Sequence, residues 1–355
     1  MISKYEALKK FILLLFYSVS FRMQHYGGLT VLTYHRISEH QDHRDPLKVS
    51  AETFEKQLIY LKECSRLLSG EELDELLRNN KSFPENAILI TFDDGWRDNY
   101  ENAYPILKKQ KVPALIFLST DYIGTNRIFW HERFKQVINN LFQDNTMKNL
   151  GDNLPKLPDD TSIRLEKIIE STGKKRARLV NDYVVHMKKY SPDRINQLID
   201  ELEQISGKKI LETPPTMLSW EEVREMAEGN VTFGSHTESH ALLTRITESE
   251  ILSELTASKR IIEEKLGRSA CFVSYPNGFY NSQVINAARD AGYSAGFTCL
   301  PGKNHDGANP FELRRKHISE YSTSGFNDQF SKLFFKIELS GIRDRIKSWR
   351  AIGDY

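Results

Sequence analysis

A chain of 355 residues is long enough for one large α/β domain or two ordinary ones, either of which can bury a sizeable core. Its 49 lysines and arginines nearly balance 48 aspartates and glutamates, so no overall field attracts nucleic acid or an anionic membrane surface. We therefore expect no nucleic-acid partner and a neutral or weakly charged substrate. Three cysteines without a CxxC spacing do not form a disulfide framework, and we expect buried thiols at Cys64, Cys271 and Cys299.

The first expected element is a helix within residues 1–26. Lysines at positions 4, 9 and 10 precede an apolar run at 11–17, which is too short to span a bilayer and is not followed by a clear cleavage site. We expect an amphipathic or apolar helix that lies on the fold or makes peripheral contact with a membrane, with a signal or anchor segment as the alternative. This favours a cytoplasmic or membrane-associated location over a secreted one.

Short apolar runs rich in β-branched and aromatic residues then predict buried strands. Helical patterns lie between most of them, such as residues 51–61 behind a capping serine at Ser50. Strand and helix in alternation indicate a mostly parallel sheet, in a barrel or an open doubly wound arrangement. The strands are expected at 29–34, 87–92, 114–118, 231–234, 271–275 and 294–299.

A charge-rich helical segment interrupts this alternation at residues 131–215, which is far longer than an ordinary connection. Ser191 and Pro192 mark a strong helix start, and an apolar stripe follows from Ile195 to Ile205. We therefore expect a helical insertion, with the main domain formed by residues 27–130 and 216–325 and a helical tail at 326–355.

Acids and histidines follow the predicted strands at three places. Asp93 and Asp94 begin an Asp-Asp-Gly turn, His236 and His240 lie four residues apart, and His35 follows the first strand. Loops at the carboxyl ends of parallel strands share one face, so these groups are expected to meet there. Two imidazoles and one carboxylate can hold a metal ion with a position open for water, next to the second carboxylate as general base. Each motif also has a structural reading, since Asp-Asp-Gly is good turn chemistry and histidine pairs arise by chance.

Several segments together resemble one known family. These are TFDDG at 91–95, GSHTESH at 234–240, LTVLTYHR at 29–36, NAYPIL at 102–107 and SYPNG at 274–278. They are similar to the polysaccharide deacetylase family, also called the NodB homology domain or carbohydrate esterase family 4. The resemblance implies a distorted (β/α)7-type barrel that carries the helical insertion, and metal-dependent removal of acetyl groups from sugars.

Matched motif by motif, the resemblance implies roles for particular residues. Asp93 is the catalytic base, and Asp94, His236 and His240 bind a divalent metal, first of all Zn²⁺, with Co²⁺ or Ni²⁺ as alternatives. A permuted subset of the family carries its general-acid histidine in a YHR segment on the first strand, which implies this catalytic role for His35. The alternative is His317, because other members carry this histidine near the C-terminus.

The segment at 274–278 departs from the family pattern. Many members have an arginine where this chain has Ser274, and that arginine steadies the base, so Arg314 or Arg315 is expected to replace it from another loop. The turn at Pro276 and Asn277 is expected to bind substrate, with a backbone N–H directed at the oxyanion. Tyr275 and Trp130 are the further candidates for substrate binding, as aromatic platforms for sugar rings.

The resemblance implies a hydrolase that acts on carbon–nitrogen bonds other than peptide bonds, removing N-acetyl groups from a polysaccharide or glycoconjugate. Its partner would be an acetylated polysaccharide or oligosaccharide, in the context of exopolysaccharide or cell-envelope metabolism. Two alternatives stay open from the sequence: an O-acetyl esterase on the same scaffold, and a non-catalytic glycan-binding protein of the envelope.

Overall fold

The structure is a computed structural model that describes residues 10, 11, 13, 14, 27–43, 45–143, 159–206, 216–342 and 344. The chain divides into two compact units. The first comprises residues 1–125, 215–244 and 248–355, and the second comprises residues 126–214 with 245–247. Each unit is described by itself.

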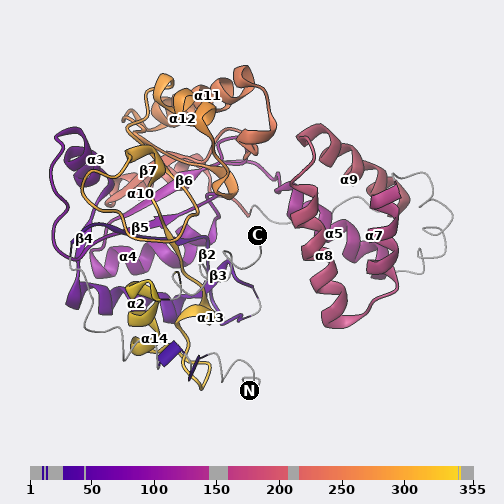
Figure 1. The fold of residues 1–355 in the computed structure, drawn as a ribbon, viewed down its shortest axis with the longest axis horizontal. Helices are drawn as coiled ribbons and strands as arrows, with labels where there is room; N and C mark the ends of the chain where they lie inside the picture. The colour runs from indigo at the N-terminus through magenta and orange to yellow at the C-terminus, as the bar shows by residue number, and fades with distance from the viewer. Residues whose placement is uncertain are drawn as a thin grey trace. The chain divides into compact units, whose positions relative to one another are not determined.

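The first unit is built on a parallel sheet that has eight strands among the described residues (Figure 1). Seven strands lie in the order β10-β1-β5-β6-β7-β8-β9. The eighth strand, β4, pairs with the first residues of β5, and β6 pairs with the last residues of β5. All six expected strands are present. The strands are β1 (Thr30–Tyr34), β4 (Arg66–Leu68), β5 (Ala87–Phe92), β6 (Ala114–Leu118), β7 (Val231–Ser235), β8 (Phe272–Ser274), β9 (Ala295–Phe297) and β10 (Lys316–His317).

The two ends of this strand order are joined by the segment 313–318. The Thr298 N–H donates to the Leu313 carbonyl at one end, and the Ile318 N–H donates to the Thr33 carbonyl at the other. The sheet is therefore strongly curled, a half-barrel with parallel strands. This confirms the predicted α/β fold of the barrel type. A separate pair, β2 (Arg36–Ser38) and β3 (Lys48–Ser50), was not predicted because both strands are only three residues long.

Helices cover the outside of the curled sheet, and serine caps define several of their starts (Figure 1). The Ser50 hydroxyl accepts the Thr53 N–H at the start of α2, as the sequence predicted, and Ser69 and Ser219 form capping boxes. The helices of this unit are α2 (Ala51–Cys64), α3 (Gly70–Arg78), α4 (Tyr104–Gln110), α10 (Trp220–Glu228), α11 (Glu248–Leu266), α12 (Ser282–Asp290), α13 (Glu320–Thr323) and α14 (Lys332–Ser340).

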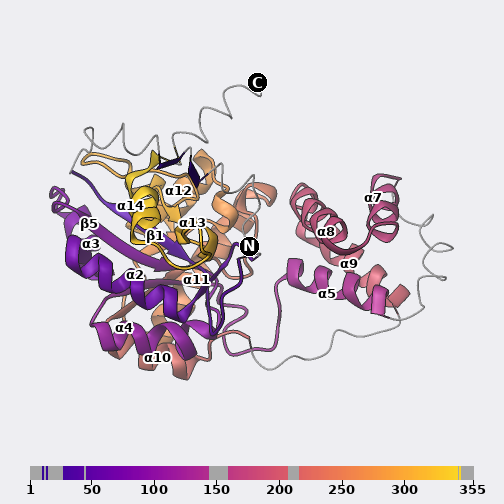
Figure 2. The ribbon, with the colours of Figure 1, turned by 90° about the horizontal axis from the view of Figure 1, so that it is seen from below.

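The second unit is helical and has its own apolar core (Figure 2). Its helices are α5 (Trp130–Gln143), α7 (Asp159–Ile169), α8 (Gly173–Met187) and α9 (Pro192–Ser206). The stripe predicted on α9 is buried at Ile195, Leu198 and Leu202, where it packs with Phe134 and Tyr183. These four helices begin close to the start of the segment 131–215 and lie within the stretch where the sequence predicts a helical insertion.

Only four residues of the predicted N-terminal helix are described, and they pack on the C-terminal part of the chain. Lys10 is buried and donates to the Gly325 carbonyl, and Leu13 packs on Phe334. Phe11 is 54% exposed, which leaves peripheral membrane contact a prediction. Among the described residues, no helix has both the length and the apolar character that crossing a bilayer demands.

The cysteine prediction was wrong in part. None of the three forms a disulfide, as expected, but Cys64 and Cys299 are exposed and Cys271 is half-buried. Cys64 is the last residue of α2, and Cys299 lies in the loop beyond β9, where the apolar run of the strand has already ended. Apolar neighbours in sequence therefore did not determine burial at these two positions.

Gly234 is a point where strand packing excludes a side chain. A Cβ there would lie 2.8 Å from the Phe272 carbonyl oxygen and 2.9 Å from the Phe117 ring. We expect Gly234→Ala to lower the free energy of unfolding by about 1–3 kcal/mol, because overpacking forces the strands apart. Gly27→Ala is the matched control, since nothing lies within 4 Å of its Cβ position. Equal denaturation midpoints for the two variants would contradict this packing.

Candidate metal centre and active site

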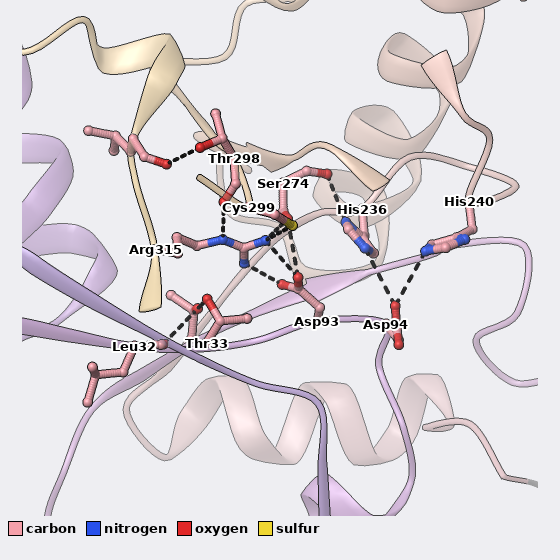
Figure 3. Close-up of polar contacts among 12 residues, drawn as sticks. Leu32, Thr33, Asp93, Asp94, His236, His240, Ser274, Thr298, Cys299 and Arg315 are labelled. Atoms are coloured by element: carbon pink, nitrogen blue, oxygen red, sulfur yellow. Dashed lines mark hydrogen bonds and ion pairs between the residues drawn. The ribbon is translucent and has the colours of Figure 1, made fainter. Parts of the chain in front are cut away.

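The candidate site lies at the carboxyl ends of the parallel strands. Asp93 and Asp94 follow β5, His236 follows β7, and His35 follows β1. From the other side of the curled sheet, β8 ends at Ser274, and the guanidinium of Arg315 reaches the same place from the residue before β10 (Figure 3). Parallel strands end on one face of a barrel, which explains how residues so distant in sequence meet.

Asp94, His236 and His240 form a cluster that can hold a metal ion. The Nε2 atoms of His236 and His240 each lie 3.5 Å from Asp94 Oδ1 (Figure 3). The three ligand atoms lie within 4.8 Å of one another, and all three residues are buried. Two imidazole nitrogens and a carboxylate oxygen suit zinc-like ions better than magnesium or calcium. The donor set therefore fits the metal that the sequence led us to expect.

Two hydrogen bonds orient these ligands. His236 Nδ1 lies 2.8 Å from the Ser274 carbonyl oxygen, so it carries the proton and leaves the Nε2 lone pair toward Asp94. Trp96 Nε1 donates to Asp94 Oδ2 over 2.8 Å, which leaves Oδ1 toward the histidines. The two hydrogen bonds thus turn His236 Nε2 and Asp94 Oδ1 toward each other, where a metal ion could bind both. Trp96 was not among the predicted site residues, although it follows the Asp-Asp-Gly turn directly.

The backbone of both ligand segments is held in an uncommon conformation. Asp94, Thr237 and His240 have φ values of 79°, 67° and 59°, in the left-handed region that side chains other than glycine rarely adopt. The β-branched Thr237 is the most unusual of these. Such strain persists only where surrounding contacts enforce it, and it concentrates at functional sites.

Asp93 is paired with a buried arginine. Nη1 of Arg315 donates to Asp93 Oδ1 over 2.7 Å and Nη2 donates to Oδ2 over 2.8 Å, a bidentate ion pair from which solvent is excluded (Figure 3). Arg315 also donates to the Ser274 hydroxyl and the Thr298 carbonyl. Of the two arginines that the sequence left open, Arg315 is therefore the one that contacts the predicted base. Arg314 is exposed and donates to the Pro301 carbonyl.

Electrostatics separate the two neighbouring acids. Burial by itself raises the pKa of Asp93, but the charge and hydrogen bonds of Arg315, with a further contribution from the neighbouring His236, outweigh it and hold the pKa below its usual range. Burial raises the pKa of Asp94 to about 6, opposed by His236 and reinforced by the Asp93 charge. Asp93 therefore stays ionised as a base must, while Asp94 is a buried carboxylate whose charge calls for a compensating cation.

The structure brings both candidate general acids to one place. The His35 and His317 rings have centroids 5.4 Å apart, with His35 half-buried and His317 exposed. His35 Nδ1 is buried and has no hydrogen-bond partner among the described residues. Burial lowers the pKa of His35 to about 3, although the Asp93 charge raises it, so the imidazole is neutral near pH 7.

The residues predicted to contact the sugar differ in their burial and packing. Tyr275 is fully buried, its hydroxyl donates to the Phe311 carbonyl and its ring stacks on Tyr280, so it has no exposed face for a sugar and the expected platform was wrong there. The run that contains Tyr275 continues the buried strand β8, and sequence could not show on which side its ring packs. Pro276 is buried, while Asn277 is half-buried in a turn with φ of 56°. Trp130 belongs to the second unit and packs against the core of that unit.

Comparison with known protein families shows which family this chain belongs to. The sequence profile of the family described as polysaccharide deacetylase matches residues 80–296, which is more than half of the chain. The chain belongs to the polysaccharide deacetylase family. Enzymes of this family are hydrolases that act on amide bonds of polysaccharides. The match includes both ligand segments and the segment of Ser274.

Individual relatives agree with this assignment. The chain is 25% identical over 292 residues to YxkH of Bacillus subtilis, itself provisionally named a polysaccharide deacetylase, covering 82% of this chain and 71% of that protein. It is 42% identical over 77 residues to the poly-β-1,6-N-acetyl-D-glucosamine N-deacetylase of Staphylococcus aureus, covering 21% of this chain and only 26% of that protein.

Solved structures share the fold at low sequence identity. The Streptococcus pyogenes deacetylase PplD, solved in complex with acetate, superposes with a TM-score of 0.54 at 20% identity, over 84% of this chain and 94% of that one. IcaB from Ammonifex degensii superposes with a TM-score of 0.52 at 21% identity, over 82% of this chain and 92% of that one.

The Arg315 ion pair generates a stability prediction. Arg315→Met would leave the Asp93 carboxylate buried without a cation, so we expect a loss of about 3–5 kcal/mol in the free energy of unfolding. Arg314→Met removes the exposed neighbouring arginine, and we expect a change of no more than about 0.5 kcal/mol. Urea denaturation of both variants measures the difference. Similar stabilities would show that the ion pair does not support the fold.

Proposed function

We propose that this chain is a metal-dependent N-deacetylase that hydrolyses N-acetyl groups of a polysaccharide built from N-acetylated hexosamine units. The observation that carries the proposal is the convergence of the Asp94, His236 and His240 ligand atoms within 4.8 Å, beside an Asp93 that Arg315 keeps ionised. The substrate class is supported by the local identity to the poly-β-1,6-N-acetyl-D-glucosamine N-deacetylase. An exopolysaccharide of this chemistry is our first candidate substrate.

Asp94, His236 and His240 would hold the metal. Zn²⁺ fits two imidazoles and one carboxylate best, with Co²⁺ and Ni²⁺ as alternatives. When bound, such an ion polarises a carbonyl group and lowers the pKa of water toward neutrality. The ion would also compensate a buried negative charge, because Arg315 already balances Asp93 and the carboxylate of Asp94 faces two histidines that supply no fixed charge.

Asp93 would take the proton from the attacking water. Its carboxylate is buried and ionised, and both of its oxygens are fixed by the Arg315 guanidinium. A fixed base loses little entropy when it meets water in the reactive geometry. Arg315 also donates to the Ser274 hydroxyl, and the Ser274 carbonyl accepts from His236. Ser274 thereby links the base to one of the metal ligands.

His35 would deliver a proton to the departing amine. Because the imidazole is neutral in the resting protein, His35 must gain this proton during turnover. The proton that Asp93 removes from water balances the one that the amine receives, so His35 acts as the carrier between the two. The backbone N–H of Asn277 is proposed to donate to the oxyanion.

Substitution of the base and of a ligand tests the proposed roles. We expect Asp93→Asn to retain stoichiometric metal but lose acetate release by at least about 10²–10⁴-fold, because general-base catalysis is removed. His236→Ala should lose metal and activity together. Asp182→Asn, an exposed acid in the second unit, is the control. The proposal fails if wild-type protein releases no acetate from N-acetylated oligosaccharides; release from O-acetylated ones alone would identify an esterase instead.

The two histidines give a separate prediction. We expect His35→Asn to lower kcat by about 10²-fold or more with KM and metal content unchanged, since proton transfer to the amine is lost. His317→Asn should stay close to wild type. Steady-state kinetics on one N-acetylated oligosaccharide measures both. The reverse pattern would assign the acid to His317.

A further inference from the structure

We propose that Arg36, Trp96 and Asp98 act together as a positioning unit that sets the orientation of Asp94, and we call these three residues the Arg36 stack. This inference rests on the proposed function, since it concerns the carboxylate that would bind the metal. None of the three belongs to the cluster of candidate ligands. Trp96 contacts Asp94 directly, and Arg36 and Asp98 would act through Trp96.

The first step is that the two Asp94 oxygens make different contacts. Oδ2 accepts the Trp96 indole N–H at 2.8 Å, and Oδ1 lies 3.5 Å from both histidine Nε2 atoms. A carboxylate free to rotate would present either oxygen, or both, to an ion. The indole fixes one oxygen and leaves the other for monodentate binding, as hydrogen bonds to ligating carboxylates do in metal sites.

The second step is what holds the indole. Trp96 is 4% exposed, and the guanidinium of Arg36 lies over its ring with 4.6 Å between Cζ and the ring centroid. A planar guanidinium stacks on an aromatic face, whereas a lysine ammonium has no such surface. The stack therefore limits rotation and tilting of the ring whose N–H points at Asp94.

The third step is what holds the guanidinium. Arg36 Nε donates to Asp98 Oδ2 over 2.8 Å, and Asp98 Oδ1 accepts the Ile37 N–H over 3.3 Å. The Asp98 side chain is only 12% exposed, so this charged hydrogen bond is largely shielded from solvent. Asn99 donates to Asp98 Oδ1 and to the His35 carbonyl. Asp98 and Asn99 thus hold the backbone on both sides of Arg36, at Ile37 and at His35. His35 is the residue proposed to carry the proton.

The test is a double-mutant cycle read out by Co²⁺ binding to the full chain. Trp96→Phe removes the N–H and keeps a ring, and Arg36→Met removes the guanidinium and keeps an apolar chain. We expect each single variant to bind Co²⁺ about 10- to 100-fold more weakly, with an altered Co²⁺ absorption spectrum. If Arg36 acts through Trp96, the double variant should bind no more weakly than Trp96→Phe alone.

Two further variants serve as controls for this result. Arg97→Met removes the arginine between Trp96 and Asp98, which pairs with Glu222 instead, and should bind Co²⁺ within about twofold of wild type. Arg36→Lys keeps a cation for Asp98 but lacks the planar surface, so an intermediate loss is expected even if Arg36→Met folds poorly. Thermal unfolding of the apo proteins identifies any variant that is misfolded.

The outcomes separate this inference from the function on which it rests. A wild-type protein that binds no Co²⁺ contradicts the proposed function itself. A wild-type protein that binds Co²⁺, with Trp96→Phe or both Arg36 variants unchanged in affinity and spectrum, overturns the Arg36 stack alone. Losses that multiply in the double variant also overturn it, because the two residues would then act independently.

Discussion

The buried ion pair between Asp93 and Arg315 is the interaction on which the site depends. Two adjacent carboxylates are buried at the end of β5, and two such charges cannot share a dry site without compensation. Arg315 compensates one of them with a bidentate pair. The other carboxylate, that of Asp94, faces His236 and His240, and a bound cation would balance its charge. This charge balance supports the proposal that Asp93 acts as the base and that Asp94 binds a metal ion.

The curled sheet makes this pairing possible. Arg315 reaches Asp93 because the segment 313–318 hydrogen-bonds to both β9 and β1, which brings the last strand back to the first. Ser274 then connects the two halves of the site, since its hydroxyl accepts from Arg315 and its carbonyl accepts from His236. The guanidinium that pairs with Asp93 thus comes from the segment that hydrogen-bonds to both β9 and β1.

Local patterns predicted the long strands and the convergence of acids and histidines at their ends. The apolar runs at 29–34, 87–92 and 231–234 are buried strands, because each combines β-branched composition with a sharp polar end. Since parallel strands end on one face, the acids and histidines that follow them were expected to meet, and their side chains do converge in the structure. Short strands such as β4 and β10 carry too little pattern to be predicted, and their pairing is decided by neighbours that are distant in sequence.

Contacts between side chains from different loops could not be predicted. The sequence offered Arg314 and Arg315 equally, and only the direction of the backbone selects Arg315. Tyr275 was expected to face a sugar, but its ring turns into the core to reach Phe311 and Tyr280. Trp96 gave no signal beyond its place after Gly95. Positive φ at Thr237 is likewise a product of tertiary contacts, since a β-branched residue does not favour it.

X-ray absorption spectroscopy at the zinc edge of the purified wild-type protein tests the central claim most directly. We expect about one zinc per chain with two imidazole ligands and further oxygen ligands at about 2.0–2.2 Å. Zinc bound through sulfur at about 2.3 Å, or a protein that retains no zinc after equilibration, would contradict it.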